Sequence, residues 1–467
     1  MMRRHLVLAL AVALLPTTAA ATDLLQTYEL ARNGDAQLSE AEYQRLATRE
    51  GAVQARAQLL PQIGGEASYT RSRSDSEGPQ IVGGQRFPSG GESTSEQTAR
   101  RLGLNVQQAI FDGTRLGQLR SQRALAEASD FLFESAGDGL ITRTSAAYFN
   151  VLVQLETLAA AEAAERALQK QFDFASKRLE VGLAPITDVH EARAQFDTAR
   201  ANTILARNAV EDAYQALVEI TGQPVANLKA LPEDFQPELP VTQDVDRWVA
   251  TAVGTNPGLR ALQLQVRAAE ESVSAARAGH WPTLYASGGY SDSNTSGNST
   301  NNLSSVVDDF ENTGRGAQVG LTLSVPIYAG GAIQSQVREA IARRDIIEEQ
   351  LEQQKRALVR NTRNAYQTLV AGISEVEARR LALVSARSAY DASQVGLEVG
   401  TRTVLDVLNN QQALFNAQQA FAQARYRFLQ NRLLLEQAAG TLDVEDVREV
   451  NRLLTAEPDV ELVPVVR

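Results

Sequence analysis

The sequence predicts an α+β membrane protein in which one unit of paired strands and long helices occurs twice. Three observations lead to this fold class. Short motifs of the first half return in the same order about 218 residues later. Proline is absent from 89–184 and from 327–457, which favours very long helices. Four stretches alternate apolar and polar residues with the period of two that is typical of barrel strands.

Residues 1–21 are predicted to be a signal peptide. Arg3 and Arg4 precede an apolar run at 6–15, and Ala19 to Ala21 supply the small residues that cleavage requires. The apolar run is too short to span a bilayer as a helix. A short buried helix is the alternative interpretation. We expect the segment to be removed on export, so that the mature chain begins near Thr22.

The internal duplication is indicated by matching residues in a fixed order. The tetrapeptide Leu-Glu-Val-Gly at 179–182 returns at 397–400, an offset of 218. Nearer the start of each copy, Pro61 matches Pro282 at an offset of 221. Loop insertions account for this drift, whereas shared helical composition alone would not reproduce the order of the Pro, Gly and Asp positions.

Each copy shows the same order of elements: a helical stretch, a strand, a polar loop, a second strand and a long helical hairpin. Long polar loops are expected between the paired strands, at roughly 72–98 and 292–316. The first repeat is expected at 22–222, with strands at about 64–75 and 99–110 and a helical hairpin at about 113–222. A linker follows at 223–245. The second repeat is expected at 246–440, with strands at about 284–292 and 317–326 and a helical hairpin at about 330–440, and a C-terminal segment follows at 441–467.

The proline-free stretches predict helices far longer than a compact domain needs. Residues 113–181 alone would form a helix of roughly 100 Å at ~1.5 Å per residue. Apolar residues spaced by seven run through 407–435, and their repeat partners at 189–217 keep the same phase. This spacing is typical of helices packed side by side in a left-handed supercoil. Locally, an ordinary antiparallel helical hairpin explains it as well.

The four candidate strands have one apolar and one polar face. Residues 102–107 and 318–325 alternate most clearly, and 66–70 and 284–291 follow the same period. A strand between lipid and water needs this alternation, although a soluble sheet with one buried face would explain any single strand. Four strands cannot close a barrel, and a bilayer tolerates no open sheet edge. Three chains with four strands each would give a closed barrel of twelve.

The composition excludes several function classes. A formal net charge of −11 argues against nucleic acid as a partner. The chain has no cysteine, which excludes disulfides, thiolate metal sites and a lipidated N-terminal cysteine. The three histidines, one of them in the signal segment, cannot build a histidine metal cluster. No phosphate-binding loop is found, so we expect no catalytic residues, no cofactor, no metal and no enzyme activity.

Four stretches carry a family resemblance that covers almost all of the mature chain. They lie at 279–284 before the third strand, at 319–331 around the end of the fourth, and at the helix tips 181–189 and 399–408. These residues resemble the outer membrane factor family of outer-membrane efflux channels. The family implies a trimeric 12-stranded transmembrane β-barrel, four strands per chain, continued by a long periplasmic α-helical coiled-coil tunnel. It also implies a mixed α/β equatorial belt, for which 223–245 and 441–467 are the candidates.

The resemblance implies a periplasmic gate formed by Thr187, Asp188, Arg402, Asp406 and Asn409. Arg402 would reach Thr187 and Asp188 of a neighbouring copy through charge-assisted hydrogen bonds that keep the entrance closed. Asp406 would form an acidic ring that favours cations. Locally, Asp188 and Asp406 are also explained as acids that complement the helix dipole in a first turn, and Arg402 as a solvated charge.

Two positions depart from the family pattern. Asn409 stands where the family has a second acidic residue, so a doubled acidic ring is not expected. Leu397 stands where the family has a tyrosine that bonds to the position of Asp188, and a leucine side chain forms no hydrogen bond. The closed state should therefore depend more on Arg402.

The outward side of the tips resembles the docking surface that the family offers to periplasmic adaptors. Glycine lets another helix tip approach the backbone closely, although a turn alone would also require it. The docking residues implied by the resemblance are Val181, Gly182, Leu183, Val399, Gly400 and Thr401.

The resemblance implies a passive exit duct for drugs or secreted proteins, located in the outer membrane and opened like an iris at its periplasmic end. The implied partners are two further copies in a homotrimer, a periplasmic adaptor (membrane fusion) protein, an inner-membrane RND or ABC transporter and outer-membrane lipid, with no nucleic acid. The alternative function is a periplasmic coiled-coil adaptor or scaffold. Adaptors typically insert one hairpin, whereas this chain repeats a hairpin together with a strand pair.

Overall fold

The computed structural model describes residues 22–82, 84–238, 244–301 and 307–456. The predicted signal peptide at 1–21 lies outside the described residues, as do parts of the predicted linker and C-terminal segment. The chain divides into two compact units. We call them the tip unit, formed by the described parts of 1–45, 130–261 and 351–467, and the sheet unit, formed by the described parts of 46–129 and 262–350.

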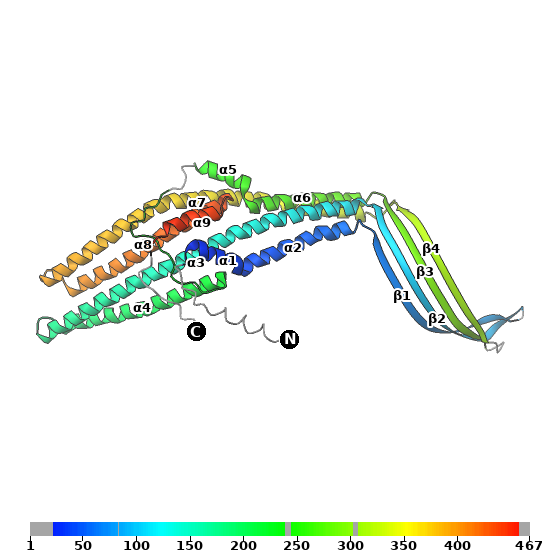
Figure 1. Ribbon diagram of the computed structural model, residues 1–467, viewed down its shortest axis with the longest axis horizontal. Coiled ribbons are helices and arrows are strands. Elements are labelled where there is room, and N and C mark those ends of the chain that lie inside the picture. The colour runs from blue at the N-terminus through cyan, green and yellow to red at the C-terminus, as the bar shows by residue number, and fades with distance from the viewer. Residues whose placement is uncertain (1–21, 83, 239–243, 302–306, 457–467) are drawn as a thin grey trace, which may run out of the picture. The chain divides into compact units, whose positions relative to one another are not determined.

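The described residues fold into long helices and one sheet (Figure 1). In chain order the elements are α1 (Leu24–Gly34), α2 (Ala36–Ala57), β1 (Gln62–Val82), β2 (Gln85–Phe111), α3 (Gly113–Glu180), α4 (Ile186–Thr221), α5 (Val245–Thr255), α6 (Pro257–Ala278), β3 (Thr283–Asn301), β4 (Val307–Ser324), α7 (Ala332–Glu398), α8 (Val404–Ala439) and α9 (Val444–Leu453).

The helix lengths show two copies of one unit. Helices α1 and α5 each have 11 residues, α2 and α6 each have 22, and α4 and α8 each have 36. Helices α3 and α7 have 68 and 67 residues. The predicted duplication and the predicted long helices are therefore confirmed. Among the described residues, no helix combines the length and the apolar character that crossing a bilayer requires.

The four strands form one antiparallel sheet in the order β1-β2-β3-β4, with β1 and β4 as its outer strands (Figure 1). The expectation of long polar loops at about 72–98 and 292–316 is wrong for most of those residues. Strands β1 and β2 stay paired as far as Val82 and Gln85, and β3 and β4 as far as Thr300 and Val307.

Polar contacts between neighbouring strands explain why the pairs extend so far. The Arg73 guanidinium lies 3.4 Å from the Glu96 carboxylate, and the Arg315 guanidinium lies 3.0 Å from the Asp292 carboxylate. Opposite charges on adjacent strands stabilise a sheet without an apolar face. Hydrophobic alternation stops where these residues begin, so a prediction that relies on alternation ends the strands too early.

One face of the sheet is apolar over the half nearer the helices, as the alternation predicts. Aligned rows run across the four strands, one formed by Ile63, Val106, Gly288 and Val319, and the next by Gly65, Leu104, Tyr290 and Ala317. Within the single chain, Val319 is 92% exposed and Leu321 is 73% exposed. Large apolar side chains that are exposed together indicate contact with lipid or with another protein. We call this side of the sheet the apolar face.

The sheet unit connects strand to helix through a capped junction. The Asp112 carboxylate accepts hydrogen bonds from the backbone at the start of α3 and from the Tyr285 hydroxyl of β3. One turn further, Gly117 of α3 lies so close to Ala275 of α6 that a side chain at position 117 would displace the Ala275 backbone. The cap fixes where α3 begins, and the glycine lets α3 and α6 pack closely.

The tip unit is held by a large apolar core and by a partly buried polar cluster. The core joins α1, α3, α4, α7, α8 and α9 to the segment at 225–235. The Arg425 guanidinium donates to both Glu156 carboxylate oxygens at 2.8 and 2.7 Å and to the Pro232 carbonyl at 3.1 Å. The Tyr426 hydroxyl donates to Glu156 at 2.8 Å and accepts from the Leu231 backbone at 3.3 Å. This cluster ties the linker to both long hairpins.

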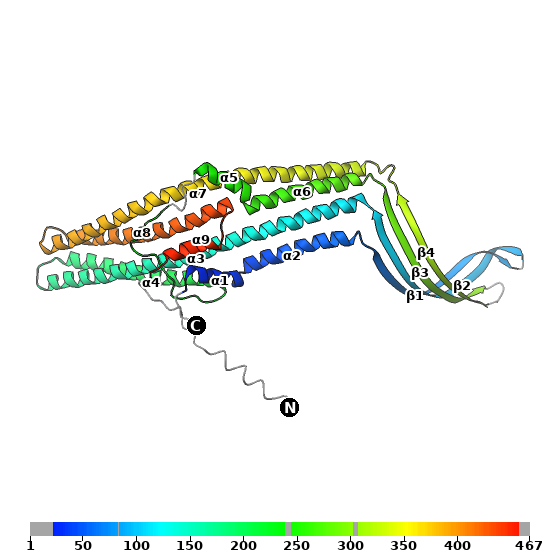
Figure 2. The same ribbon diagram turned by 45° about the horizontal axis from the view of Figure 1, so that its top comes forward.

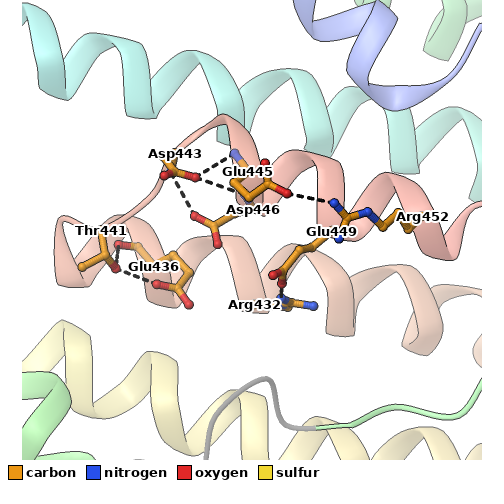
Figure 3. A network of polar contacts seen from close by, with 8 residues as sticks. All are labelled: Arg432, Glu436, Thr441, Asp443, Glu445, Asp446, Glu449 and Arg452. Carbon is orange, nitrogen blue, oxygen red and sulfur yellow. Dashed lines mark hydrogen bonds and ion pairs between the residues drawn. The ribbon is translucent and has the colours of Figure 1, made fainter.

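A second polar network attaches α9 to the end of α8 (Figure 3). Asp443 caps α9 by accepting hydrogen bonds from the backbone of Glu445 and Asp446. Arg432 of α8 forms an ion pair with Glu449 of α9. Burial raises the pKa of Glu436 and of Asp446, which face this network from α8 and α9.

Candidate functional site at the helix tips

The α3–α4 tip is a glycine-dependent turn. The Leu183 backbone N–H donates to the Arg178 carbonyl at 2.8 Å, and the Gly182 N–H donates to the Leu179 carbonyl at 2.9 Å. This pair of bonds forms a Schellman motif, which requires the left-handed conformation that Gly182 adopts, with φ of 74°. Helix α4 then begins after Pro185, whose fixed φ suits the position before a first turn.

The α7–α8 tip repeats this turn at the equivalent residues. The Thr401 N–H donates to the Gly396 carbonyl at 2.8 Å, the Gly400 N–H donates to the Leu397 carbonyl at 3.2 Å, and Gly400 has a φ of 80°. Both hairpin tips lie at the same end of the tip unit (Figure 2). The matching geometry explains why the Leu-Glu-Val-Gly motif occurs twice in the sequence.

Apolar side chains project from both turns. Val181 and Leu183 are each 68% exposed, and Val399 is 69% exposed. Gly182 and Gly400 have no other atoms within 4 Å of the position a Cβ would take. Each tip therefore presents apolar groups around an open stretch of backbone, which is a surface that another helix tip can approach.

Asp406 is a helix-capping residue. Its carboxylate accepts from the Thr403 N–H and from the Thr403 hydroxyl, each at 2.9 Å, and the Thr403 hydroxyl accepts from the Asp406 N–H at 3.2 Å. This reciprocal pair is a capping box. The bonds from Thr403, with a smaller contribution from the Arg402 charge, lower the pKa of Asp406, which therefore stays ionised at neutral pH. The local explanation of Asp406 is thus correct, and it leaves a negative charge at the tip.

Asp188 and Arg402 differ from Asp406 because neither side chain is held by a hydrogen bond or ion pair among the described residues, although the Arg402 charge acts on Asp406. Helix α4 has no side-chain cap, and within the described residues no hydrogen bond or ion pair reaches the Asp188 carboxylate or the Arg402 guanidinium. Thr187 and Arg402 are exposed, and Asp188 is partly exposed. The structure places Asn409 in the second turn of α8, also exposed. Of the predicted gate residues, Asp406 is engaged in its capping box, whereas the exposed Thr187 and Arg402 and the partly exposed Asp188 are accessible to another molecule.

Leu397 is part of a small apolar cluster behind the tips. Its six buried side chains come from all four hairpin helices: Leu168, Ala199, Leu397, Val404, Val407 and Leu408. Phe196 of α4 packs against this cluster and stacks on Phe172 of α3 at 6.2 Å between ring centroids. Leu397 therefore joins the two hairpins by packing, where a tyrosine would add a hydrogen bond.

Gly396 is a tip residue that the sequence analysis missed. A Cβ at this position would lie 2.6 Å from Cγ and 3.2 Å from Cβ of Arg402. The Arg402 N–H also donates to the Gly396 carbonyl at 3.1 Å. Glycine thus lets the aliphatic part of Arg402 lie across the end of α7, which sets the direction of its guanidinium. The signal available in the sequence is a second glycine four residues before Gly400.

Asp138 is a further group that the sequence did not identify. It lies in the middle of α3 between Gly137 and Gly139, near Tyr28 of α1, and no described hydrogen bond or ion pair reaches its carboxylate. Burial, together with the nearby Glu134 charge, raises the pKa of Asp138 to about 7. Keeping this group ionised therefore destabilises the fold at neutral pH.

Asp138→Asn is expected to raise stability at pH 8 and to remove part of its pH dependence. The folded-state pKa lies above the unfolded value, so the stability that protonation contributes is present at low pH and is lost as pH rises through about 7. Partial exposure limits the gain to about 1–2 kcal/mol. Thermal unfolding followed by circular dichroism at pH 5 and pH 8 measures it. Glu134→Gln should shift the same transition to lower pH, and equal gains for Asp138→Asn at both pH values would contradict the assignment.

Comparison with known proteins assigns the chain to a family. A family model described as outer membrane efflux protein matches residues 27–223 and 248–441, one stretch in each repeat. The chain belongs to the outer membrane efflux protein family. Outer membrane protein TolC of Escherichia coli (strain K12) is 37% identical over 438 residues, which cover 93% of this chain and 85% of the relative. Alkaline protease secretion protein AprF of Pseudomonas aeruginosa is 30% identical over 441 residues, covering 94% and 88%.

Solved structures of outer membrane channels show the same fold. The CmeC outer membrane channel of Campylobacter jejuni superimposes with a TM-score of 0.74 at 18% identity, covering 92% of this chain and 90% of that chain. The open state of the MtrE outer membrane channel of Neisseria gonorrhoeae gives a TM-score of 0.67 at 18% identity, covering 90% and 89%. The predicted fold class, barrel strands continued by a helical tunnel, is confirmed.

As a member of the outer membrane efflux protein family, the chain is an outer-membrane channel-tunnel for efflux or secretion, with its tunnel in the periplasm. The family assignment excludes the alternative of a periplasmic adaptor. The predicted roles of the tip residues are not tested by the comparisons and stay predictions. Among the described residues, no group of three or more His, Asp or Glu side chains is arranged to hold a metal ion.

Proposed function

We propose that three copies of the chain form a passive exit duct. The described residues of each chain contribute four strands, and among these residues β1 and β4 each have one edge without a paired strand. In a bilayer such edges must pair, because no water is present to satisfy their backbone groups. Three copies close a barrel of twelve strands. The observation that carries the proposal is the combination of this open sheet with two helix tips at which the Asp188 and Arg402 side chains have no hydrogen bond or ion pair among the described residues.

The gate of the duct is formed by Arg402 of one copy and by Thr187 and Asp188 of the next. The proposal is supported by the exposed Arg402 and Thr187 side chains and by the partly exposed, unpaired Asp188 carboxylate. A guanidinium that donates to a carboxylate forms a directional, charge-assisted bond. Asp406, ionised and held by its capping box, adds an acidic ring that favours cations, whereas Asn409 adds no charge.

Opening separates the two hairpins near their tips. The cluster that joins them there has only six buried side chains, and the large core lies further along the hairpins. Regions with few buried contacts open at the lowest free-energy cost. The tips can therefore move outward like an iris while the partly buried Arg425–Glu156 cluster keeps the linker in place.

The outward surface of the tips docks a periplasmic adaptor protein, which connects the duct to an inner-membrane RND or ABC transporter. The exposed Val181, Leu183 and Val399 side chains and the open backbone at Gly182 and Gly400 support this assignment, and Thr401 completes the second turn. The duct itself has no enzyme activity and needs no cofactor, so the transporter supplies the energy.

Conductance and complementation together test the proposed function. The purified protein should migrate as a heat-modifiable trimer, conduct ions across a planar bilayer, and restore drug tolerance or protein secretion to a strain that lacks its own channel. A protein that stays monomeric, or a trimer without conductance, would contradict the duct. Conductance without complementation by any transporter system would contradict the proposed partners.

A further inference from the structure

The apolar face of the sheet ends abruptly at one row of residues. Leu102 of β2 is aligned with Ala67 of β1, and both lie on the apolar face. In the same row, β3 and β4 carry Asp292 and Arg315, joined by an ion pair of 3.0 Å. Because the helices occupy the periplasmic end of the strands, this boundary lies at the extracellular edge of the lipid-facing band.

Tyr69 and Arg100 form the next row beyond the boundary. They are aligned across β1 and β2, and the Arg100 guanidinium lies 5.7 Å from the centre of the Tyr69 ring. Tyr69 is 65% exposed in the single chain. Exposed aromatic side chains are typical of the two edges of the lipid-facing band of a barrel. No carboxylate among the described residues forms an ion pair with Arg100. Arg100 is therefore an unneutralised cation at the lipid interface.

Arg71 lies beside Arg100 on the same face. Its aligned partner on β2 is Thr98, so Arg100 is its diagonal neighbour, at a separation of about 7–8 Å for such pairs. The Arg71 side chain is 71% exposed and lies 3.5 Å from Glu96. Glu96 also pairs with Arg73 at 3.4 Å, and Arg73 pairs in addition with Asp75 at 3.5 Å, so two carboxylates serve Arg71 and Arg73. With Asp75 and Glu96 set against Arg71, Arg73 and Arg100, the group keeps one positive charge in excess, and Arg100 is the arginine without an ion pair among the described residues.

We propose that Arg71 and Arg100 bind the phosphate groups of a phosphorylated lipid in the outer leaflet of the outer membrane. The two guanidinium groups form parallel hydrogen bonds to phosphate oxygens, the contact for which arginine is best suited. The acyl chains of the lipid lie on the apolar rows below, against Leu102, Leu104 and Tyr290. A free phosphate ion would not gain this second contact, so the occupant is a lipid and not inorganic phosphate.

Arg101 provides a matched control on the same strand. Side chains alternate along a strand, so Arg101 points to the opposite side of the sheet, where it is aligned with Ser68 and Ser293. Arg100 and Arg101 are both exposed and adjacent in sequence. Replacing one removes a charge from the lipid side, and replacing the other removes the same charge from the lumen side.

The test compares lipid binding by the trimer and by two variants. The purified, delipidated trimer is titrated with diphosphoryl lipid A in detergent, with lipid A from which both phosphates have been removed, and with millimolar inorganic phosphate. The readouts are bound lipid by native mass spectrometry and the temperature at which the trimer dissociates. We expect Arg71→Gln combined with Arg100→Gln to bind diphosphoryl lipid A on the order of tenfold more weakly than the wild type, and Arg101→Gln to bind it unchanged.

Dephosphorylated lipid A should bind the wild type and the double variant alike, and inorganic phosphate should not raise the dissociation temperature. The proposal is overturned if the double variant keeps wild-type affinity, if phosphate removal leaves wild-type binding unchanged, or if inorganic phosphate stabilises the trimer as much as the lipid does. Should the double variant fail to assemble, the single variants Arg71→Gln and Arg100→Gln are each expected to show a smaller loss.

Discussion

Gly182→Leu and Gly400→Leu are each expected to lower drug tolerance to the level of a strain without the channel, while the trimer still forms. Both glycines have positive φ and no atoms within 4 Å of the Cβ position. A leucine therefore strains the turn by only about 1–2 kcal/mol and meets no steric obstacle in its own chain. The side chain instead occupies the space into which the adaptor tip must fit. Growth in the presence of drugs and heat-modifiable migration on gels measure the two effects.

Two controls separate docking from turn strain. Gly84, in the turn between β1 and β2, has a φ of 84° and also has no atoms within 4 Å of the Cβ position. Gly84→Leu therefore imposes the same backbone strain in the β1–β2 turn, outside the proposed docking surface, and should leave efflux intact. Gly182→Asn keeps a residue that tolerates the left-handed conformation and yet adds bulk, so it should also impair efflux. Normal drug tolerance in both leucine variants at the tips would exclude docking at these glycines.

Arg402→Ser is expected to shift the channel towards its open state. Each proposed link to Thr187 and Asp188 of a neighbouring copy contributes about 1 kcal/mol in water, and a trimer has three. Losing all three lowers the ratio of closed to open channels by about two orders of magnitude. Single-channel recordings in planar bilayers should show a several-fold higher average conductance, and the effect should shrink at high salt because the links are already screened in the wild type.

Arg193→Ser is the control for the loss of a charge near the tips. Arg193 is an exposed arginine of α4 that pairs with Asp197 of the same helix at 3.8 Å, so its removal breaks no link between copies. The conductance of the Arg193→Ser channel should match that of the wild type. Gly396→Ala is expected to give a weaker version of the Arg402→Ser effect, because it redirects the arginine without removing it. Wild-type gating in Arg402→Ser would remove this residue from the gate.

The long helices were predictable because proline is excluded from the interior of a helix, so that a long proline-free stretch indicates where one can run. The proline-free stretch located α3 at 113–181, and the structure has it at Gly113–Glu180. The strands were predictable only as far as their apolar alternation. Beyond it, ion pairs such as Arg315–Asp292 hold the backbone in register, and opposite charges on adjacent strands leave no periodic signal in the sequence.

The tip turns could be predicted, and the contacts of the gate could not. A glycine at the end of a long helix indicates a left-handed turn, and Gly182 and Gly400 both adopt one. Asp406 was predicted either to cap or to line the gate, and its capping box is formed. The proposed partner of Arg402 belongs to another copy, and within the described residues of one chain no hydrogen bond or ion pair reaches its guanidinium.

Residues that act through three-dimensional proximity were missed for a different reason. Glu156 and Arg425 are 269 positions apart in the sequence and meet as a partly buried ion pair. Asp138 looks like one more helix acid in the sequence, and only its burial near Tyr28 distinguishes it. Burial and pairing depend on which helices become neighbours, and amphipathic periodicity gives the buried side of a helix without naming its neighbour.

The equal lengths of the repeated helices determine what kind of contact a ring of these hairpins can form. In a ring of identical hairpins, every hairpin would present the same residues to its neighbours. Duplication within one gene lets alternate hairpins differ while the ring keeps its spacing: position 402 is arginine in the second repeat, and its equivalent in the first is Ala184. One hairpin can thus specialise as hydrogen-bond donor and the next as acceptor. A trimer of such chains has six hairpins in a nearly sixfold ring. Because the two repeats can evolve separately, neighbouring hairpins can form complementary contacts that threefold symmetry allows and exact sixfold symmetry would not.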